Sequence, residues 1–325
     1  MDGLLGLAAD NLLTPMILCF ALGLAAALAR SDLSVPEAAA KAMSLYLLFS
    51  IGFKGGVAVS GHGLDLGLGA ALVAGVILSA VLPLVAFPLL GALTRLNVTD
   101  RAAVAAHYGS ISIVTFVTAT SVLADRGIAA EGYMVAVAAA MEAPAIVSAL
   151  WLVARSGGGA RMDAGLWREI LLNGSIVLLV GAFLIGMATG EEGKARIDAF
   201  ITAPFQGVLC LFLLDMGLIA GRGLREVRGT LGAGVLVFGV AMPVIGAAAG
   251  LGTALMLGLS PGGAALMMTL CASASYIAVP AAMRVALPEA NPSVYLTLSL
   301  GVTFPFNLIL GIPAYTAVAL AVTGG

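Results

Sequence analysis

Ser110-Ile111-Ser112-Ile113-Val114-Thr115 places three hydroxyl side chains in the middle of a long apolar segment. A second cluster, Ser273-Ala274-Ser275-Tyr276-Ile277-Ala278, lies at the corresponding place in the second half of the chain, again inside an apolar segment. Lipid contains no water that could satisfy such groups, and matching polar breaks in the two halves of a chain are a sequence sign of a transporter binding site. The pair therefore predicts a duplicated membrane protein with its site at the two clusters.

The composition of the whole chain agrees with a membrane protein. Of the 325 residues, 61% are hydrophobic and 10% are charged, whereas a soluble domain is about 45–50% apolar and about 25% charged. The net charge is −2 and no basic tract is present, so no nucleic-acid partner is expected. The N-terminus lacks a basic region, so no cleaved signal peptide is expected. The three cysteines lie singly in apolar segments and are interpreted as small packing residues.

Apolar runs of about 20 residues predict ten membrane helices. They lie near 11–29, 36–59, 66–93, 102–124, 132–154, 168–189, 199–221, 229–257, 262–287 and 293–322. Pro305 and Pro313 are expected to bend or divide the last helix. The fold class predicted is an all-α polytopic membrane protein.

Further matches extend the repeat beyond the two clusters. Leu47–Gly52 answers Phe212–Gly217, and Pro144 answers Pro305, each pair at nearly the same spacing along the chain as the two clusters. A repeat of five helices is odd, so the second copy must enter the membrane from the opposite side. The domains predicted are a first repeat (1–154), a short cytoplasmic link (155–167) and a second, inverted repeat (168–325), with helices 4 and 9 broken at the hydroxyl clusters.

The basic residues predict the orientation. Loops after odd-numbered helices hold eleven of them and the other side holds four. The eleven are Arg30, Lys41, Arg95, Arg101, Arg155, Arg161, Arg168, Arg222, Arg225, Arg228 and Arg284; the four are Lys54, Arg126, Lys194 and Arg196. Both termini are therefore expected outside the cell and the link in the cytoplasm.

The two breaks are candidate binding sites for a small anion. A helix that stops and restarts inside the membrane leaves an N-terminus with free amides and partial positive charge, which favours an anion. Hydroxyl groups can donate to the anion or offer oxygen atoms to sodium; they are those of Ser110, Ser112, Thr115, Ser273 and Ser275. The alternative is that these hydroxyls only bond across closely packed helices.

Three ionisable residues lie inside apolar helices, where charge is costly and suggests function. Glu142 precedes Pro144 and is a candidate sodium ligand, proton site or gate. Lys54 and Asp215 occupy nearly equivalent positions in the two repeats and either act in transport or form an internal salt bridge. His107 is expected at the membrane interface.

Enzymatic motifs are absent from the sequence. His62 and His107 are the only histidines, which excludes a His-rich metal centre, and no GxxxxGK[ST] phosphate loop is present. We therefore expect neither an enzyme nor an ATP-driven pump; transport would draw on an ion gradient or run downhill.

With these features established, the chain resembles the sodium-dependent bicarbonate transporter family. The matching stretches are Pro36-Glu37, Ile51-Gly52, Gly55–Ala58, Tyr108–Thr115, Met141–Ala145, Met216-Gly217, Pro280–Arg284 and, most specifically, Leu287–Ser293. The resemblance implies a scaffold of helices 1, 2, 6 and 7 and a moving core of helices 3–5 and 8–10. It also implies a homotrimer, with sodium and bicarbonate bound where broken helices 4 and 9 cross. The layout is similar to that of bile acid–sodium symporters.

Two features depart from the family pattern. The well-known carriers have an aspartate after the second hydroxyl cluster, where this chain has Tyr276. They also have a long cytoplasmic insertion linked to a PII-like regulator, where this chain has only the short link around Gly157–Gly159. A PII-like partner therefore stays open, and Tyr276 leaves the coupling ion and the anion open.

The leading hypothesis is sodium-driven, elevator-like uptake of bicarbonate across the inner membrane of the cell. The substrate site predicted consists of Ser110, Ser112, Ile113, Thr115, Ser273, Ser275 and Tyr276. The candidate ligands of the coupling ion are Glu142, Ser112, Ser275, Asn307 and Asp215. No cofactor other than sodium is expected. The alternatives are a sodium-coupled symporter of an organic anion, or a channel or membrane sensor on the same fold.

Overall fold

The computed structural model describes residues 14–60, 66–156, 172, 174–226 and 232–324. Residues 1–13 and most of the predicted link lie outside these ranges. All regular elements of the described part are helical. Seven helical stretches there are long and apolar enough to cross a membrane, and two shorter apolar helices accompany them. The chain is thus an all-helical, multi-pass membrane protein.

The helices follow one another with short connections. In chain order they are α2 (Pro15–Leu28), α3 (Glu37–Ser60), α4 (Leu66–Leu93), α5 (Val98–Gly109), α6 (Ile113–Asp125), α7 (Met134–Ala140), α8 (Pro144–Arg155), α10 (Gly174–Ile201), α11 (Phe205–Glu226), α12 (Ala233–Leu257), α13 (Pro261–Ala272), α14 (Ala278–Ala286), α15 (Pro292–Leu296), α16 (Phe304–Phe306) and α17 (Ile312–Thr323). Two π-helical segments, η1 (Thr297–Thr303) and η2 (Asn307–Gly311), flank α16.

Two helix pairs each join one helix from either half of the chain: α3 packs along α10, and α2 packs along α11. Glycines allow the close approach. Gly52 of α3 faces the Leu179 carbonyl of α10, and Gly217 of α11 faces the Phe20 carbonyl of α2. A side chain at either position would collide with that backbone, which is the usual reason for small residues between membrane helices. The two glycines end the matching stretches Leu47–Gly52 and Phe212–Gly217, so they are equivalent positions of the sequence repeat.

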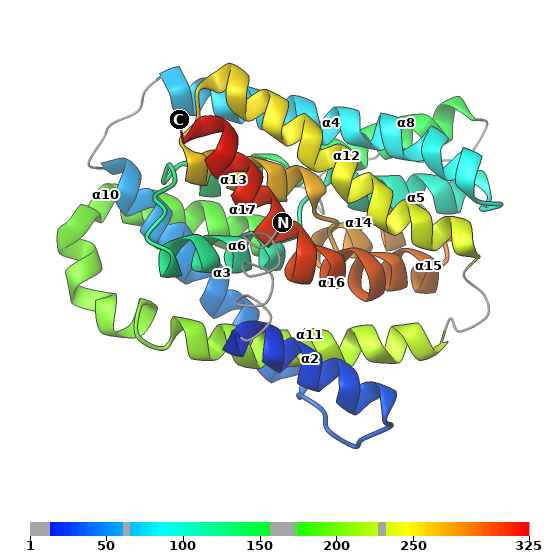
Figure 1. Cartoon of the computed structure of the whole chain (residues 1–325), viewed down its shortest axis with the longest axis horizontal. Helices are drawn as coiled ribbons and strands as arrows, with labels where there is room; N and C mark the ends of the chain where they lie inside the picture. Colours follow the sequence, from blue (N-terminus) through cyan, green and yellow to red (C-terminus); the bar gives the residue numbers. More distant parts are fainter. Residues whose placement is uncertain (1–13, 61–65, 157–171, 173, 227–231, 325) are drawn as a thin grey trace.

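The remaining helices form a second group. α5 packs between α4 and α8, and α13 packs between α12 and α17. In Figure 1, α4 and α12 run along one side of the molecule, α2 and α11 along the opposite side, and α5, α6, α13 and α17 between them. The second half of α5 and nearly all of α13 are buried, so both helices are surrounded by protein.

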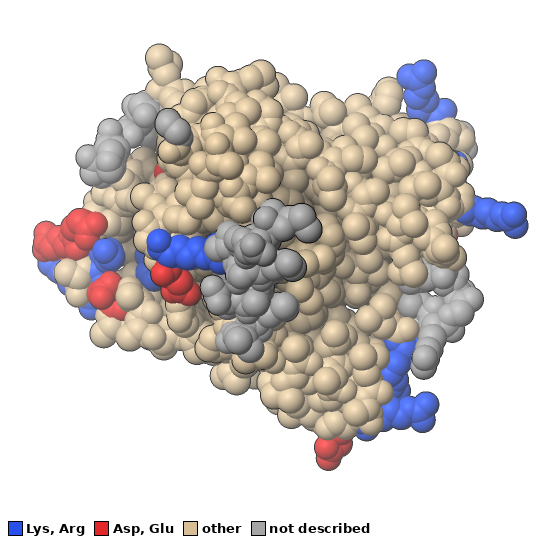
Figure 2. Space-filling model, in the orientation of Figure 1, with Lys and Arg blue, Asp and Glu red and all other residues tan. Residues whose placement is uncertain are grey.

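Charged side chains gather toward the two ends of the molecule on the face that Figure 2 shows. A broad uncharged belt lies between these ends, as a membrane-spanning surface requires. One end in this view carries mainly basic side chains, whereas the other carries acidic and basic side chains together.

The structure corrects two helix boundaries. The sixth predicted helix ends at residue 189, but α10 continues to Ile201 through a kink at Gly190 (φ 58°, ψ −153°). The added turns are charged and held by ion pairs such as Arg196–Glu192 at 2.6 Å, so the helix outlasts its apolar part. The tenth segment stays helical from Pro292 to Thr323 but becomes π-helical on both sides of Pro305. Proline removes a backbone donor, and the ladder changes register around it.

Candidate functional site

The first hydroxyl cluster lies where α5 ends and α6 begins. Helical geometry stops after Gly109, and Ser110 and Ser112 are both extended. Ser112 is the N-cap of α6: its hydroxyl accepts from the Thr115 amide (3.2 Å) and the Thr115 hydroxyl (2.9 Å). The cap satisfies one amide of the first turn, and the general shortage of partners at a helix start leaves amides to bind something else.

The second cluster has the same position between α13 and α14. Ser273 is extended and ends α13, and its hydroxyl donates to the Leu270 carbonyl (2.8 Å). Ser275 accepts from the Val279 amide at 3.4 Å, so it caps the start of α14. Ser112 and Ser275 are each the second serine of their cluster, and they thus have equivalent roles in the two halves.

The two interruptions touch each other. The Ser112 amide donates to the Ser273 hydroxyl (2.9 Å), and the Ser275 amide donates to the His107 carbonyl (2.7 Å). Backbone groups that a continuous helix would satisfy are therefore satisfied by the opposite half of the chain. This is how non-helical backbone is tolerated at membrane depth.

Glu142 joins the first interruption from the turn between α7 and α8. Its Oε2 accepts from the Ser110 hydroxyl at 2.8 Å, and both side chains are buried. The turn itself is held open by Ser79 of α4, whose hydroxyl donates to the Met141 carbonyl (2.6 Å) and accepts from the Ala145 amide (3.2 Å). In an unbroken helix these two backbone groups would bond to each other, so Ser79 is inserted into the ladder.

A small pocket forms where these parts meet. It has a volume of about 10 Å³ and is lined by residues of both interruptions together with Glu142: Ile111, Ser112, Ile113, Glu142, Ser275, Tyr276 and Ile277. A cavity of this size holds about one water molecule. It suits a single bare cation among oxygen atoms, whereas an anion of four heavy atoms needs the surrounding segments to separate.

Tyr276 closes one side of the pocket. Its ring packs edge-on against Phe304, with centroids 5.5 Å apart, and only 8% of the residue is exposed. The Tyr276 hydroxyl faces Ser112 but makes no hydrogen bond of ordinary geometry. A buried polar group without a good partner is costly and points to a partner outside the chain.

The structure brings most of the predicted residues together. Ser112, Ile113, Ser275, Tyr276 and Glu142 line the pocket, and Ser110, Thr115 and Ser273 bond to its lining. Two candidate ion ligands lie elsewhere. Asn307 of η2 donates to the Ala272 carbonyl (2.8 Å) and accepts from the Tyr315 hydroxyl (2.9 Å), so both ends of its amide are occupied. Asp215 lies on α11, buried at 4% exposure and away from the pocket lining.

Two expectations about single residues are wrong. Lys54 and Asp215 do not form a salt bridge; the described part of the chain has only Lys194–Glu191 and Arg196–Glu192. His107 does not lie at an interface. It is fully buried, bonds through Nδ1 to the Ala103 carbonyl (2.6 Å) and stacks on Tyr295. Its position follows from α5, which the protein encloses well before its end.

Ser79, Tyr108 and Thr303 support the site but were not predicted from sequence. Tyr108 and Thr303 bond hydroxyl to hydroxyl, and Thr303 also donates to the Gly239 carbonyl (2.7 Å). Thr303 precedes Pro305 as Glu142 precedes Pro144, so a repeat alignment could have found it. Ser79 has no hydroxyl counterpart in the second half and left no such signal.

No group of three or more histidine, cysteine or acidic residues is placed to hold a metal ion in the described ranges. The candidate site therefore consists of hydroxyls, backbone amides and one carboxylate.

The comparison with protein families decides the relationship of the chain. Residues 15–320, nearly the whole sequence, match the Na⁺-dependent bicarbonate transporter superfamily. The chain belongs to this superfamily. The search of curated proteins finds no match.

Membership of the superfamily gives the two departures in the sequence a structural setting. Where the well-known carriers have an aspartate, Tyr276 fills the pocket wall with an aromatic ring. The remaining carboxylate of the pocket is Glu142, which enters from α7–α8 and not from the second interruption. A negative charge is thus kept at the pocket, on the side of the first repeat.

Proposed function

We propose that the chain is a secondary active transporter that takes up bicarbonate together with sodium. The observation that carries the proposal is the pocket in which both interrupted helices meet Glu142. Superfamily membership supports the pair of transported ions.

The pocket supplies what each ion requires. Sodium is a hard cation that prefers oxygen ligands, and the Glu142 carboxylate with the Ser112 and Ser275 hydroxyls would provide them. Bicarbonate would accept hydrogen bonds from the first-turn amides of α6 and α14, aided by the partial positive charge there. Because the pocket measures about 10 Å³, bicarbonate would enter only when these helix ends separate.

We further propose ten membrane crossings arranged as two inverted repeats, with the broken crossings 4 (α5 and α6) and 9 (α13 and α14). The three crossings beyond the seven long stretches would be α2, α10, and α13 with α14. Paired contacts between the halves support the proposal. Glu131 of the first half bonds to the Ser260 amide at the start of α13 (2.7 Å). Likewise, the Asn291 amide of the second half bonds to Asp100 at the start of α5 (2.8 Å).

The two packing groups suggest how the transporter moves. α2, α3, α10 and α11 would form the scaffold, and the group around α5 and α13 would form the core that carries the pocket across the membrane. Glycine contacts lock the scaffold pairs together. A homotrimer built on this scaffold and a PII-like regulator both remain proposals of the family pattern.

The distribution of charge supports an orientation with both termini outside. Basic side chains gather at one end of the molecule (Figure 2), which would be the cytoplasmic end by the positive-inside rule. An inward sodium gradient across the inner membrane would then drive uptake.

The proposal is tested by uptake of labelled bicarbonate into proteoliposomes that contain the purified protein, with and without an inward sodium gradient. We expect saturable uptake that requires sodium. Absence of uptake by protein that elutes as a single folded species would overturn the proposal. Non-saturating current without counterflow would instead indicate a channel.

A sodium-coupled symporter of a small organic anion is the second candidate. A cavity of about 240 Å³, lined mostly by apolar side chains of α3, α6 and the segment before α7, favours it. A thermal-shift screen of small carboxylates distinguishes the two, since stabilisation by a carboxylate and not by bicarbonate would favour this candidate.

A further inference from the structure

Two cavities lie between the helices proposed as scaffold and those proposed as core. The first, here the Lys54 cavity, measures about 240 Å³ and includes Lys54, Gly55, Ala58, Glu131, Gly132 and Val135. The second, the Arg222 cavity, measures about 310 Å³ and includes Ile219, Ala220, Gly223, Pro292, Ser293 and Leu296.

The two cavities are related by the sequence repeat. The three named α3 positions of the first map onto the three named α11 positions of the second by the shift in numbering that relates Gly52 to Gly217. The three positions that precede or begin the next helix map by the shift that relates Pro144 to Pro305. In an inverted repeat, equivalent cavities open toward opposite sides of the membrane. They therefore have the placement of the two entrances of an alternating-access path.

Each cavity contains one basic side chain that is not paired with a carboxylate. Lys54 lines the first, and its Nζ lies 4.9 Å from the centre of the Phe205 ring. Arg222 lines the second, one helical turn beyond the repeat equivalent of Lys54, and donates to the Leu33 carbonyl (3.0 Å). Neither belongs to the two salt bridges of the described residues.

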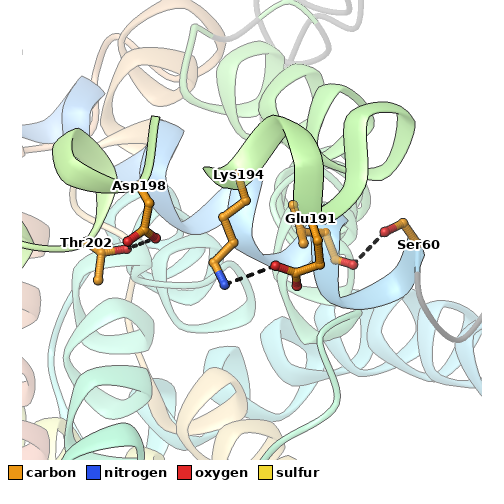
Figure 3. Close-up of polar contacts among 6 residues, drawn as sticks. Ser60, Glu191, Lys194, Asp198 and Thr202 are labelled. Atoms are coloured by element: carbon orange, nitrogen blue, oxygen red, sulfur yellow. Dashed lines mark hydrogen bonds and ion pairs between the residues drawn. The ribbon is translucent and has the colours of Figure 1, made fainter. Parts of the chain in front are cut away.

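Neighbouring charges do not cancel that of Lys54. Glu131 shares the cavity, but its carboxylate accepts from the amide (2.7 Å) and the hydroxyl (2.9 Å) of Ser260. Asp198 and Lys194 of α10 act on Lys54 with opposite signs. Figure 3 shows both engaged on α10 itself, Lys194 with Glu191 (3.4 Å) and Asp198 with Thr202 (2.8 Å).

The Arg222 cavity has one acidic neighbour in its own helix. Asp215 precedes Arg222 by two turns along α11 and is buried without an ion pair to it. A cationic group beside a low-dielectric cavity attracts anions and raises their local concentration.

We infer that Lys54 and Arg222 are the anion-selecting residues of two opposite entrances to the transport path. The inference rests on the proposed transport of a small anion and names the groups that would bring it to the pocket. Lys54 acts on the external side and Arg222 on the cytoplasmic side.

The transport test uses K54M and R222M, with the charge-keeping variants K54R and R222K as matched controls. In intact cells we expect K54M to raise KM for external bicarbonate about fivefold with little change in kcat. K54R and R222M should leave this KM close to that of the wild type. An unchanged KM in K54M, with sodium-dependent uptake intact, overturns the inference and leaves the proposed function standing.

A second measurement does not depend on transport. In a background with the three native cysteines replaced by alanine, T120C reports on the Lys54 cavity and S293C on the Arg222 cavity, because Thr120 and Ser293 line them. The readout is the ratio of modification rates with an anionic and a cationic thiosulfonate reagent. K54M should lower this ratio about fivefold at T120C and not at S293C; R222M should do the reverse.

The two measurements separate the possible failures. Unchanged ratios in folded variants overturn the inference whatever the protein transports. Shifted ratios in a protein that takes up no bicarbonate support the inference and overturn the proposed function. If K54M does not fold, K54Q is used, and elution as a single species in detergent is the criterion for folding.

Discussion

The Ser110 hydroxyl donates to Oε2 of Glu142 at 2.8 Å, inside the protein and between two places where helices are interrupted. The bond ties the end of α5 to the turn between α7 and α8. Through it, the carboxylate stays beside the pocket formed by both interruptions. Hydrogen bonds to charged groups are about twice as strong as those between neutral groups, so the bond also fixes the carboxylate in place.

Glu142→Gln is expected to weaken sodium coupling while the fold persists. Glutamine keeps an oxygen that accepts from Ser110 but removes the negative charge near a bound cation. We expect the sodium concentration for half-maximal uptake to rise at least about tenfold. Uptake at varied sodium measures it. S110A is the control, since it removes the hydrogen bond and keeps the charge; a sodium response of E142Q equal to that of the wild type would exclude Glu142 as a ligand.

Ser112→Ala combined with Ser275→Ala should abolish uptake of bicarbonate. Each serine caps a helix that starts at the pocket, and each hydroxyl lines it. Loss of an N-cap costs about 1 kcal/mol, too little to unfold the protein. Uptake in proteoliposomes and the oligomeric state in detergent are measured together. Wild-type uptake by the double variant would remove both serines from the site.

Tyr276→Phe should not destabilise the substrate-free protein. The hydroxyl is buried and lacks a good hydrogen bond, so its removal is expected to leave the unfolding free energy unchanged or to raise it by about 1 kcal/mol. The stabilisation by added bicarbonate should shrink, because the hydroxyl faces the pocket. A denaturant titration with and without bicarbonate measures both effects. A clear loss of stability without bicarbonate, of the size expected when a buried hydrogen bond is broken, would show that the hydroxyl already has a partner within the chain.

The position of the site could be predicted from sequence because its chemistry is unusual for its surroundings. Hydroxyl clusters in apolar segments pointed to Ser110–Ser112 and Ser273–Ser275, and helical geometry is interrupted at both. Glu142 stood out for the same reason, as a carboxylate in an apolar run next to Pro144. Local composition carries these signals, so no knowledge of packing was needed.

The residues that depend on tertiary contacts could not be predicted in this way. Ser79 acts on Met141 and Ala145, which are distant along the chain, and a serine in an apolar helix gives no sign of such a partner. The burial of His107 depends on how deeply the protein encloses α5. The length of α10 depends on ion pairs that hydropathy does not register.

Ser79→Ala should destabilise the protein by about 1–3 kcal/mol, because it leaves the Met141 carbonyl and the Ala145 amide without their bonds to the hydroxyl in a buried turn. Ser50→Ala is the matched control, because both serines have 0% exposure but the Ser50 hydroxyl makes no hydrogen bond of ordinary geometry. Denaturant titration of the detergent-solubilised protein measures the difference, and equal effects of the two changes would contradict the role assigned to Ser79.

Gly56→Ala tests the close contact between α3 and α10. A methyl group on Gly56 would meet the Phe183 carbonyl and the Met187 amide, which are backbone atoms that cannot turn aside. The helices must therefore separate, and such overpacking costs about 1–3 kcal/mol. Gly181→Ala on α10 is the control, since no atom lies within 4 Å of the added methyl, and we expect it to be neutral or to stabilise by up to about 1 kcal/mol. If the pair belongs to a rigid scaffold, G56A should also lower uptake, whereas G181A should not; equal stability of the two variants would mean that α3 and α10 can part without cost.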